Sequence, residues 1–170
     1  MAGQSSYPLK RLVWCGILAA LCIVFRLFLA PLPNIQPVTS LLIIICLYIS
    51  AKDAAIIASL SLILSNIFLG LGPWTLAQIA AYFSIIILTK GLSQPIKSHP
   101  LPAGALWASL TGYLYGLIIS LIQAPFYGIS NFLVYYLGGL LFDSYHALGN
   151  LIFYLLVYRF IPLLVSKYPH

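Results

Sequence analysis

The sequence contains very little charge. Only 6% of its 170 residues are charged, and two acidic residues stand against eight Lys and Arg. A soluble globular domain has about 25% charged residues, and so few charges cannot cover a folded domain of this size in water. The soluble classes of protein are therefore excluded, and the 62% share of hydrophobic residues indicates a chain that folds in lipid.

Motifs for nucleotide use and hydrolysis are also absent from the sequence. There is no GxxxxGK[ST] phosphate loop, no HExxH zinc motif and no GxSxG nucleophile motif. Cys15, Cys22 and Cys46 lie inside apolar runs without CxxC spacing, which predicts packing rather than a disulfide framework or a zinc site. We therefore expect no catalytic residue, no metal site and no cofactor in this chain.

The apolar residues occupy enough of the chain for six membrane spans. One span needs about 20 apolar residues, so six take roughly 120 and leave about 50 for loops and ends. The fold class predicted is all-α, a single six-helix polytopic membrane domain over 1–170. The breaks at Pro and Gly predict spans at about 11–30, 38–50, 53–69, 74–90, 103–122 and 144–165, a loop at 91–102, and a short outer-leaflet helix at 131–141.

Apart from Arg26, the basic residues occur at alternate breaks between the spans and at the ends of the chain. The breaks at 31–37, 70–74 and 123–130 contain no Lys or Arg. The other breaks and the ends of the chain hold Lys10, Arg11, Lys52, Lys90, Lys97, Arg159 and Lys167. The positive-inside rule then predicts an even number of spans with both termini in the cytoplasm. The net charge of +6 is thereby assigned to orientation in the membrane, and not to nucleic-acid binding.

Both acidic residues lie near the start of a predicted helix. Asp53 is predicted to be the N-cap of the helix at 53–69, where a carboxylate also suits the helix dipole. Asp143 has two open interpretations, as a cap of the last span or as a ligand contact. Asp143, His146 and Asn150 are spaced three and four apart, so they share one helical face. For His146 and Asn150, hydrogen bonding between helices is the alternative to ligand binding.

Polar side chains gather in the outer half of the predicted bundle. Ionisable groups are expensive in hydrocarbon and are therefore functional candidates. Arg26 has two other interpretations, snorkelling to the interface or pairing with Asp143. Because five separate segments bring polar and aromatic groups to the same side, we predict an outward-facing ligand pocket. Its predicted residues are Arg26, Asn34, Gln36, Asn66, Trp74, Gln78, Tyr127, Asp143, His146 and Asn150.

Small residues form a seam on the first predicted helix. Gly16 and Ala20 are four apart, and Ala19 lies beside them. Small residues at this spacing let a second helix approach closely in lipid, where packing rather than the hydrophobic effect drives association. The seam can contact a partner protein or the chain's own helices, and the spacing does not choose between them.

Four motifs, in this order, resemble those of the substrate-binding S component of an energy-coupling factor (ECF) vitamin transporter. They are GILAAL at 16–21, PNIQPVT at 33–39, SNIFLGLGPWT at 65–75 with Gln78, and FDSYHALGN at 142–150. The resemblance covers nearly the whole chain. It is greatest to the branch associated with cobalamin and with queuosine precursors.

This resemblance implies a transport subunit without ATPase activity of its own, in the plasma membrane of a prokaryotic cell. Such a subunit captures a micronutrient from outside, topples against a transmembrane coupling subunit, and is reset by two cytoplasmic ATPase subunits. The family's small-residue motif on the first helix meets the coupling subunit. It carries over to Gly16, Ala19 and Ala20, although this chain departs from an all-alanine pattern.

The substrate and the protein class both have alternatives. Few charges face the predicted pocket, which argues against a polyanionic ligand. The resemblance favours cobalamin, and S components for pyridoxine, hydroxymethylpyrimidine or a queuosine precursor are the next candidates. A small intramembrane enzyme using Asp143 and His146 is the rival of another class, and a purely structural assembly subunit is the third.

Overall fold

The computed structural model describes residues 9–168, and all regular structure in that range is helical. Five of the helices are long and apolar enough to cross a membrane, and α2 is a shorter apolar helix. The chain is therefore an all-α polytopic membrane protein, as predicted. The helices are α1 (Leu9–Phe28), α2 (Val38–Tyr48), α3 (Ala51–Leu69), α4 (Pro73–Gly91), α5 (Ser93–Ser98), α6 (Pro100–Phe126), α7 (Phe132–Tyr158) and α8 (Ile161–Lys167).

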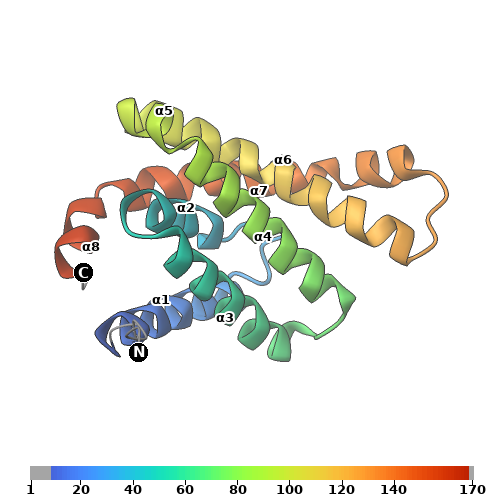
Figure 1. Cartoon of the computed structure of the whole chain (residues 1–170). Helices are drawn as coiled ribbons and strands as arrows, with labels where there is room; N and C mark the ends of the chain where they lie inside the picture. Colours follow the sequence, from blue (N-terminus) through green and yellow to red (C-terminus); the bar gives the residue numbers. More distant parts are fainter. Residues whose placement is uncertain (1–8, 169–170) are drawn as a thin grey trace, which may run out of the picture.

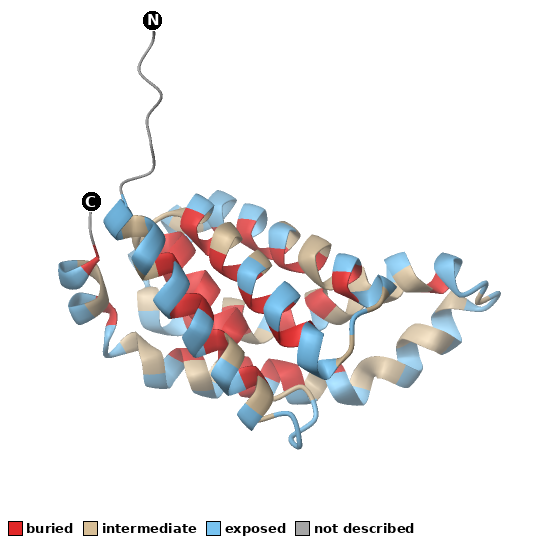
Figure 2. Ribbon diagram, turned by 90° about the horizontal axis from the view of Figure 1, so that it is seen from below, coloured by how far each residue is buried: buried red, intermediate tan, exposed pale blue. Residues whose placement is uncertain are grey.

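The short helix α2 forms the centre of the bundle. It contacts α3, α4, α6 and α7, and every residue from Val38 to Leu47 is buried. Burial on all sides explains why α2 is apolar all round. Figure 2 shows buried residues gathered in this part of the bundle, whereas the protruding α6–α7 hairpin is mostly intermediate or exposed.

Apart from Arg26, the segments that carry the basic residues and both ends of the described chain lie at one end of the bundle, which we call the basic end (Figure 1). Two contacts join its segments. Lys97 Nζ lies 5.6 Å from the ring centroid of Tyr48, and the Tyr154 hydroxyl donates to the Pro100 carbonyl at 2.9 Å. The turns at 29–37, 70–72 and 127–131 lie toward the opposite end, which we call the uncharged end. The cytoplasmic location of the basic end stays a prediction from the charge pattern.

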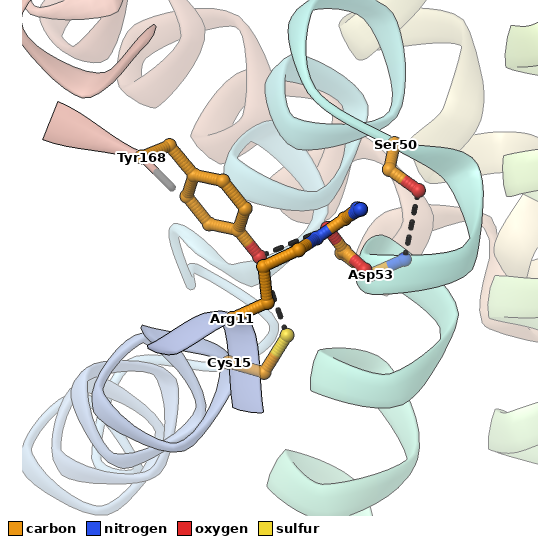
Figure 3. Close-up of polar contacts among 5 residues, drawn as sticks. All are labelled: Arg11, Cys15, Ser50, Asp53 and Tyr168. Carbon is orange, nitrogen blue, oxygen red and sulfur yellow. Dashed lines mark hydrogen bonds and ion pairs between the residues drawn. The ribbon is translucent and has the colours of Figure 1, made fainter. Parts of the chain in front are cut away.

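Asp53 is not the N-cap of α3, contrary to the prediction. The cap is Ser50, whose Oγ accepts a hydrogen bond from the Asp53 N–H at 3.4 Å. The buried Asp53 carboxylate instead pairs with Arg11 at 2.6 Å and accepts from the Tyr168 hydroxyl at 3.0 Å (Figure 3). Ser50 and Asp53 have the spacing of a capping box. The two partners of the carboxylate are far away in sequence, so local pattern could not indicate them.

This cluster joins the start of α1, the start of α3 and the residue after α8 (Figure 3). Cys15 Sγ lies 3.3 Å from the Tyr168 hydroxyl oxygen, so the phenol contacts both α1 and α3. Burial raises the pKa of the Tyr168 phenol, which keeps it a hydrogen-bond donor at neutral pH. A protonated donor and the Arg11 guanidinium together compensate the buried carboxylate of Asp53.

The last part of the chain forms one long helix rather than the two predicted at 131–141 and 144–165. The helix α7 has 27 residues and continues through Gly138 and Gly139, and α8 follows it. Each glycine costs a helix only about 1 kcal/mol. Ending a helix in lipid would leave backbone groups without partners at a higher cost. Asp143 therefore lies in a helix interior, and its interpretation as a cap is excluded.

The predicted loop at 91–102 is also largely helical. It holds α5, and α6 begins at Pro100. Proline fits the first turn of a helix, because the N–H it lacks would have no intrahelical partner there. The 27 residues of α6 give it a length of about 40 Å. Since a hydrocarbon core is about 30 Å thick, the α6–α7 hairpin is long enough to extend beyond it (Figure 1).

Glycines on α6 let α7 pack closely against it. A Cβ added at Gly112 would collide with the backbone of Ala147, and one added at Gly116 would collide with the Asp143 carboxylate. A third, Gly104, accommodates the Tyr154 ring in the same way. Close packing of small residues is the usual source of helix association in lipid. The position of α7 therefore depends on this glycine face.

Replacing Gly112 with valine should destabilise the fold. The added atoms meet the backbone of α7, which cannot move as a side-chain tip can, and overpacking costs about 1–3 kcal/mol. The free energy of unfolding, measured by SDS titration in mixed micelles, should fall by that amount. Gly16→Ala is the control, because a Cβ there meets no atom within 4 Å. Equal stability of Gly112→Val and the parent chain would contradict this interpretation of the packing.

Candidate functional site

A cavity of about 760 Å³ lies between the 29–37 turn, α4, α6 and α7. This volume is within the range of small-molecule sites, roughly 300–1,000 Å³. The cavity combines polar and aromatic side chains, as ligand pockets do. Those that line it are Asn34, Gln78, Ser120, Gln123, Asp143, Trp74, Tyr115, Tyr135 and Phe142.

Arg26 lies beside this cavity at the centre of a polar network. It is only 4% exposed, and its guanidinium donates to Ser65 Oγ at 2.7 Å, Gln36 Oε1 at 3.2 Å and Asn66 Oδ1 at 3.1 Å. All three acceptors are neutral, and no carboxylate within residues 9–168 forms an ion pair with Arg26. Snorkelling and pairing with Asp143 are therefore both excluded. The charge is held by neutral hydrogen-bond acceptors from the 29–37 turn and α3.

Asn66 carries the network from Arg26 onward to α4. Its amide nitrogen donates to Thr75 Oγ1 at 3.0 Å and to Gln78 Oε1 at 2.7 Å. Because Gln78 also lines the larger cavity, the network reaches the cavity wall. Asn66 itself orients Arg26 and Gln78 and does not line the cavity.

A second cavity of about 60 Å³ adjoins the first and forms its polar inner part. It has room for water or a small polar group. Three of its residues, Asn34, Gln78 and Tyr115, also line the larger cavity. The others are Arg26, Gln36, Tyr82 and His146.

His146 faces this inner cavity from α7. Its Nε2 lies 2.9 Å from Thr39 Oγ1, and the Thr39 hydroxyl is 3.3 Å from that of Tyr82. The imidazole also meets the Tyr115 ring edge-on, with centroids 4.9 Å apart. The other ring nitrogen, Nδ1, is buried and has no hydrogen-bond partner in the described chain. One nitrogen is thus held by the fold, while the other has no partner among residues 9–168.

Asp143 lies one helical turn before His146 and lines the larger cavity. The residue is only 5% exposed, and within residues 9–168 its carboxylate has no hydrogen bond and no ion pair. Gly116 on α6 leaves the space that the carboxylate occupies. Asp143 is therefore a hydrogen-bond acceptor at the cavity wall that has no partner within the described residues.

The structure brings most of the predicted pocket residues together. Seven line one or both cavities, namely Arg26, Asn34, Gln36, Trp74, Gln78, Asp143 and His146. Asn66 supports them from behind. Two of the ten lie elsewhere, Asn150 and Tyr127.

Asn150 and Tyr127 have other surroundings. Asn150 is fully buried between helices, where its side-chain amide nitrogen donates to Thr111 Oγ1 at 3.5 Å and its backbone carbonyl accepts from the Ser40 hydroxyl at 2.7 Å. It is therefore a helix contact, the alternative that the sequence left open. Tyr127 lies half exposed beyond the end of α6 against the ring of Phe126. It does not line either cavity.

Several lining residues lie outside the predicted set. Tyr115 and Tyr82 face the inner cavity, and Tyr135 donates to Gln123 Oε1 at 3.2 Å across the α6–α7 hairpin. Tyrosines in a membrane protein commonly lie at the membrane interface. With twelve tyrosines in the chain, the sequence does not distinguish those that line the cavity from those at the interface. The available signal was the position of Tyr115 near the middle of an apolar run, far from either interface.

The small-residue seam on α1 divides between the two sides of the helix. Gly16 and Ala20 are exposed, and a Cβ at Gly16 would meet no atom within 4 Å. Ala19 is instead buried in the chain's own core, because it lies on the side of α1 that faces the bundle. The surface open to a partner is therefore formed by Gly16 and Ala20.

Comparison with known proteins gives no relative. No protein-family model, no curated protein and no solved structure matches the chain.

Replacing Arg26 with leucine should destabilise the bundle at the site. Ser65, Gln36 and Asn66 would lose their shared donor, and each buried group left without a partner costs about 1–3 kcal/mol. The free energy of unfolding in mixed micelles should fall by at least that amount, whereas Arg159→Leu, at an exposed position, should change it little. Equal effects of the two substitutions would contradict the structural role of Arg26.

Proposed function

We propose that the chain is the S component of an ECF transporter, which takes up a vitamin from outside the cell and has no ATPase activity of its own. The observation that carries the proposal is the polar cavity within a bundle of apolar helices. Three of the four motifs that resemble S components contribute its wall, through Asn34 and Gln36, Trp74 and Gln78, and Asp143 and His146. Their convergence supports the proposal, because residues far apart in sequence meet at one ligand-sized space.

In this proposal the ligand enters from the uncharged end and the basic end faces the cytoplasm of a prokaryotic cell. The S component then topples in the bilayer against the transmembrane coupling subunit, and two cytoplasmic ATPases reset it. The exposed positions of Gly16 and Ala20 support a contact on this side of α1, since a second helix can approach them closely. Cobalamin is the first ligand to test, followed by pyridoxine, hydroxymethylpyrimidine and queuosine precursors.

A binding measurement tests the ligand-capturing function. Titration of the purified protein in a calorimeter with this vitamin panel should give one-to-one binding of one ligand without turnover. Gln78→Ala should weaken that binding about 3- to 10-fold, because it removes a hydrogen-bonding group from the wall of both cavities. Gln94→Ala is the matched control, since Gln94 is exposed on α5 at the other end.

Three outcomes separate the protein classes. Binding without turnover supports an S component. Conversion of a lipid or peptide by the isolated chain, lost in His146→Ala, would replace the proposal with an intramembrane enzyme. Binding of no member of the panel at millimolar concentration would overturn the proposal and favour a structural subunit.

A tryptophan on the exposed side of α1 should block assembly with the coupling subunit while leaving ligand binding intact. Gly16→Trp and Ala20→Trp put a large ring where the close helix contact is proposed, away from both cavities. The coupling subunit and ATPases should then fail to co-purify with either variant. Leu106→Trp, at an exposed apolar position on α6, should co-purify normally. A normal complex with both α1 variants would contradict this contact.

A further inference from the structure

The two acidic residues of the chain have opposite surroundings. At the basic end, Asp53 pairs with Arg11 and accepts from Tyr168. Asp143 is also buried, at 5% exposed, but its carboxylate has no polar partner within residues 9–168, and it lines the cavity of about 760 Å³. A carboxylate in the hydrocarbon region is costly and is normally paired. The missing partner of Asp143 is therefore expected from the contents of the cavity.

The rest of the cavity wall indicates what kind of partner fits. Trp74, Tyr115, Tyr135 and Phe142 line the same space as Asp143. Aromatic faces attract organic cations, and the attraction is larger where water is excluded. A metal ion would need more ligands, and in the described chain no group of three or more His, Cys, Asp or Glu could hold one. An organic cation satisfies the carboxylate and the aromatic wall together.

The neighbouring residues distinguish this part of the cavity from its inner part. The inner part is lined by Arg26 and His146, and the Arg26 guanidinium suits an acceptor on the ligand. Asp143 lies one turn away from His146, about 5 Å along α7. A ligand of modest size can therefore place an acceptor at the inner cavity and a donor at Asp143.

We propose that the ligand carries a cationic nitrogen, such as a protonated amine, which pairs with the Asp143 carboxylate among the aromatic side chains of the cavity. This proposal rests on the proposed function and narrows its ligand class. It goes beyond the sequence, which argues only against a polyanionic ligand, because the structure shows which acidic residue has no partner among residues 9–168. Neutral donors, such as the amides of cobalamin, are the competing partners for Asp143.

Matched ligand pairs test the charge directly. Each pair differs in one substituent, an aminomethyl group against a neutral one: pyridoxamine against pyridoxine, 5-aminomethyl- against 5-hydroxymethyl-4-amino-2-methylpyrimidine, and 7-aminomethyl- against 7-cyano-7-deazaguanine. These pairs and cobalamin are titrated at pH 7 into the parent protein, Asp143→Asn and Tyr145→Phe. Tyr145 is the control, since it lies on the same helix but is exposed and does not line the cavity.

The expected result is a preference for charge that depends on Asp143. In at least one pair the amine should bind about 10-fold or more tightly than its neutral partner, the size typical of a charge-assisted hydrogen bond. Asp143→Asn should reduce that ratio below about 3-fold, while Tyr145→Phe keeps it. A fluorescence size-exclusion profile checks that each variant is folded.

The other outcomes separate this proposal from the proposed function. Binding of cobalamin or of a neutral member alone, or a ratio unchanged in Asp143→Asn, would overturn the Asp143 proposal and leave the S-component function standing. Binding of no panel member would overturn the function, and this proposal with it. If Asp143→Asn does not fold, the ratio in the parent protein decides, and a ratio of one or less overturns the proposal.

Discussion

The close contact between α6 and α7 is the interaction on which the rest of the structure depends. It is possible because Gly112 and Gly116 carry no side chain toward α7, so the backbone of Ala147 and the carboxylate of Asp143 fit against α6. This contact sets the rotation of α7, and with it the direction of His146. The two cavities exist where the paired helices meet α4 and the 29–37 turn. Packing of small residues thus determines the position of the polar ones.

The arrangement of the polar groups inside the bundle reflects the need for hydrogen-bond partners in lipid. Water is absent from the hydrocarbon region, so each buried donor or acceptor needs a protein partner. Arg26 meets this requirement with three neutral acceptors, and Asn66 continues the network to Gln78. Within residues 9–168, neither the Asp143 carboxylate nor His146 Nδ1 has such a partner, and both residues line a cavity. The buried Oδ1 atoms of Asp53 and Asn150 also lack a partner in the described chain, but neither residue lines these cavities. Asp143 and His146 therefore differ from them in lying at the space proposed for a ligand.

The two ends of the bundle differ in how closely their helices are connected. At the basic end, the pairing of Asp53 with Arg11 and Tyr168 connects the first span, the third span and the end of the described chain. Toward the uncharged end the helices separate around a cavity, and the α6–α7 hairpin protrudes (Figure 1). A firmly connected end and an open end are compatible with the ligand-capturing role proposed above. The exposed Gly16 and Ala20 lie on α1, apart from both cavities.

Much of this was predictable from the sequence, and the exceptions share a physical cause. The helices that follow from Pro and Gly breaks, the basic end, and the convergence of Arg26 with Gln36 and Gln78 all depend on local pattern. The errors at Asp53 and at 131–143 arose because a cap and a helix break were assigned from local preference. In lipid, backbone pairing and distant partners outweigh that preference. Tyr115 was not among the predicted pocket residues, because the spacing of apolar residues along α6 does not distinguish the side facing the cavity from the side facing lipid.

By itself the sequence determined that this is a multi-pass membrane protein and where most of its helices lie along the chain, because hydropathy acts on each segment separately. Its charge pattern predicts an orientation in the bilayer. Only the tertiary structure decided which acidic residue is paired, which amides are structural and which side of α1 is open. Those properties depend on which helices touch, and helix contact in lipid depends on the fit of small residues from distant parts of the chain.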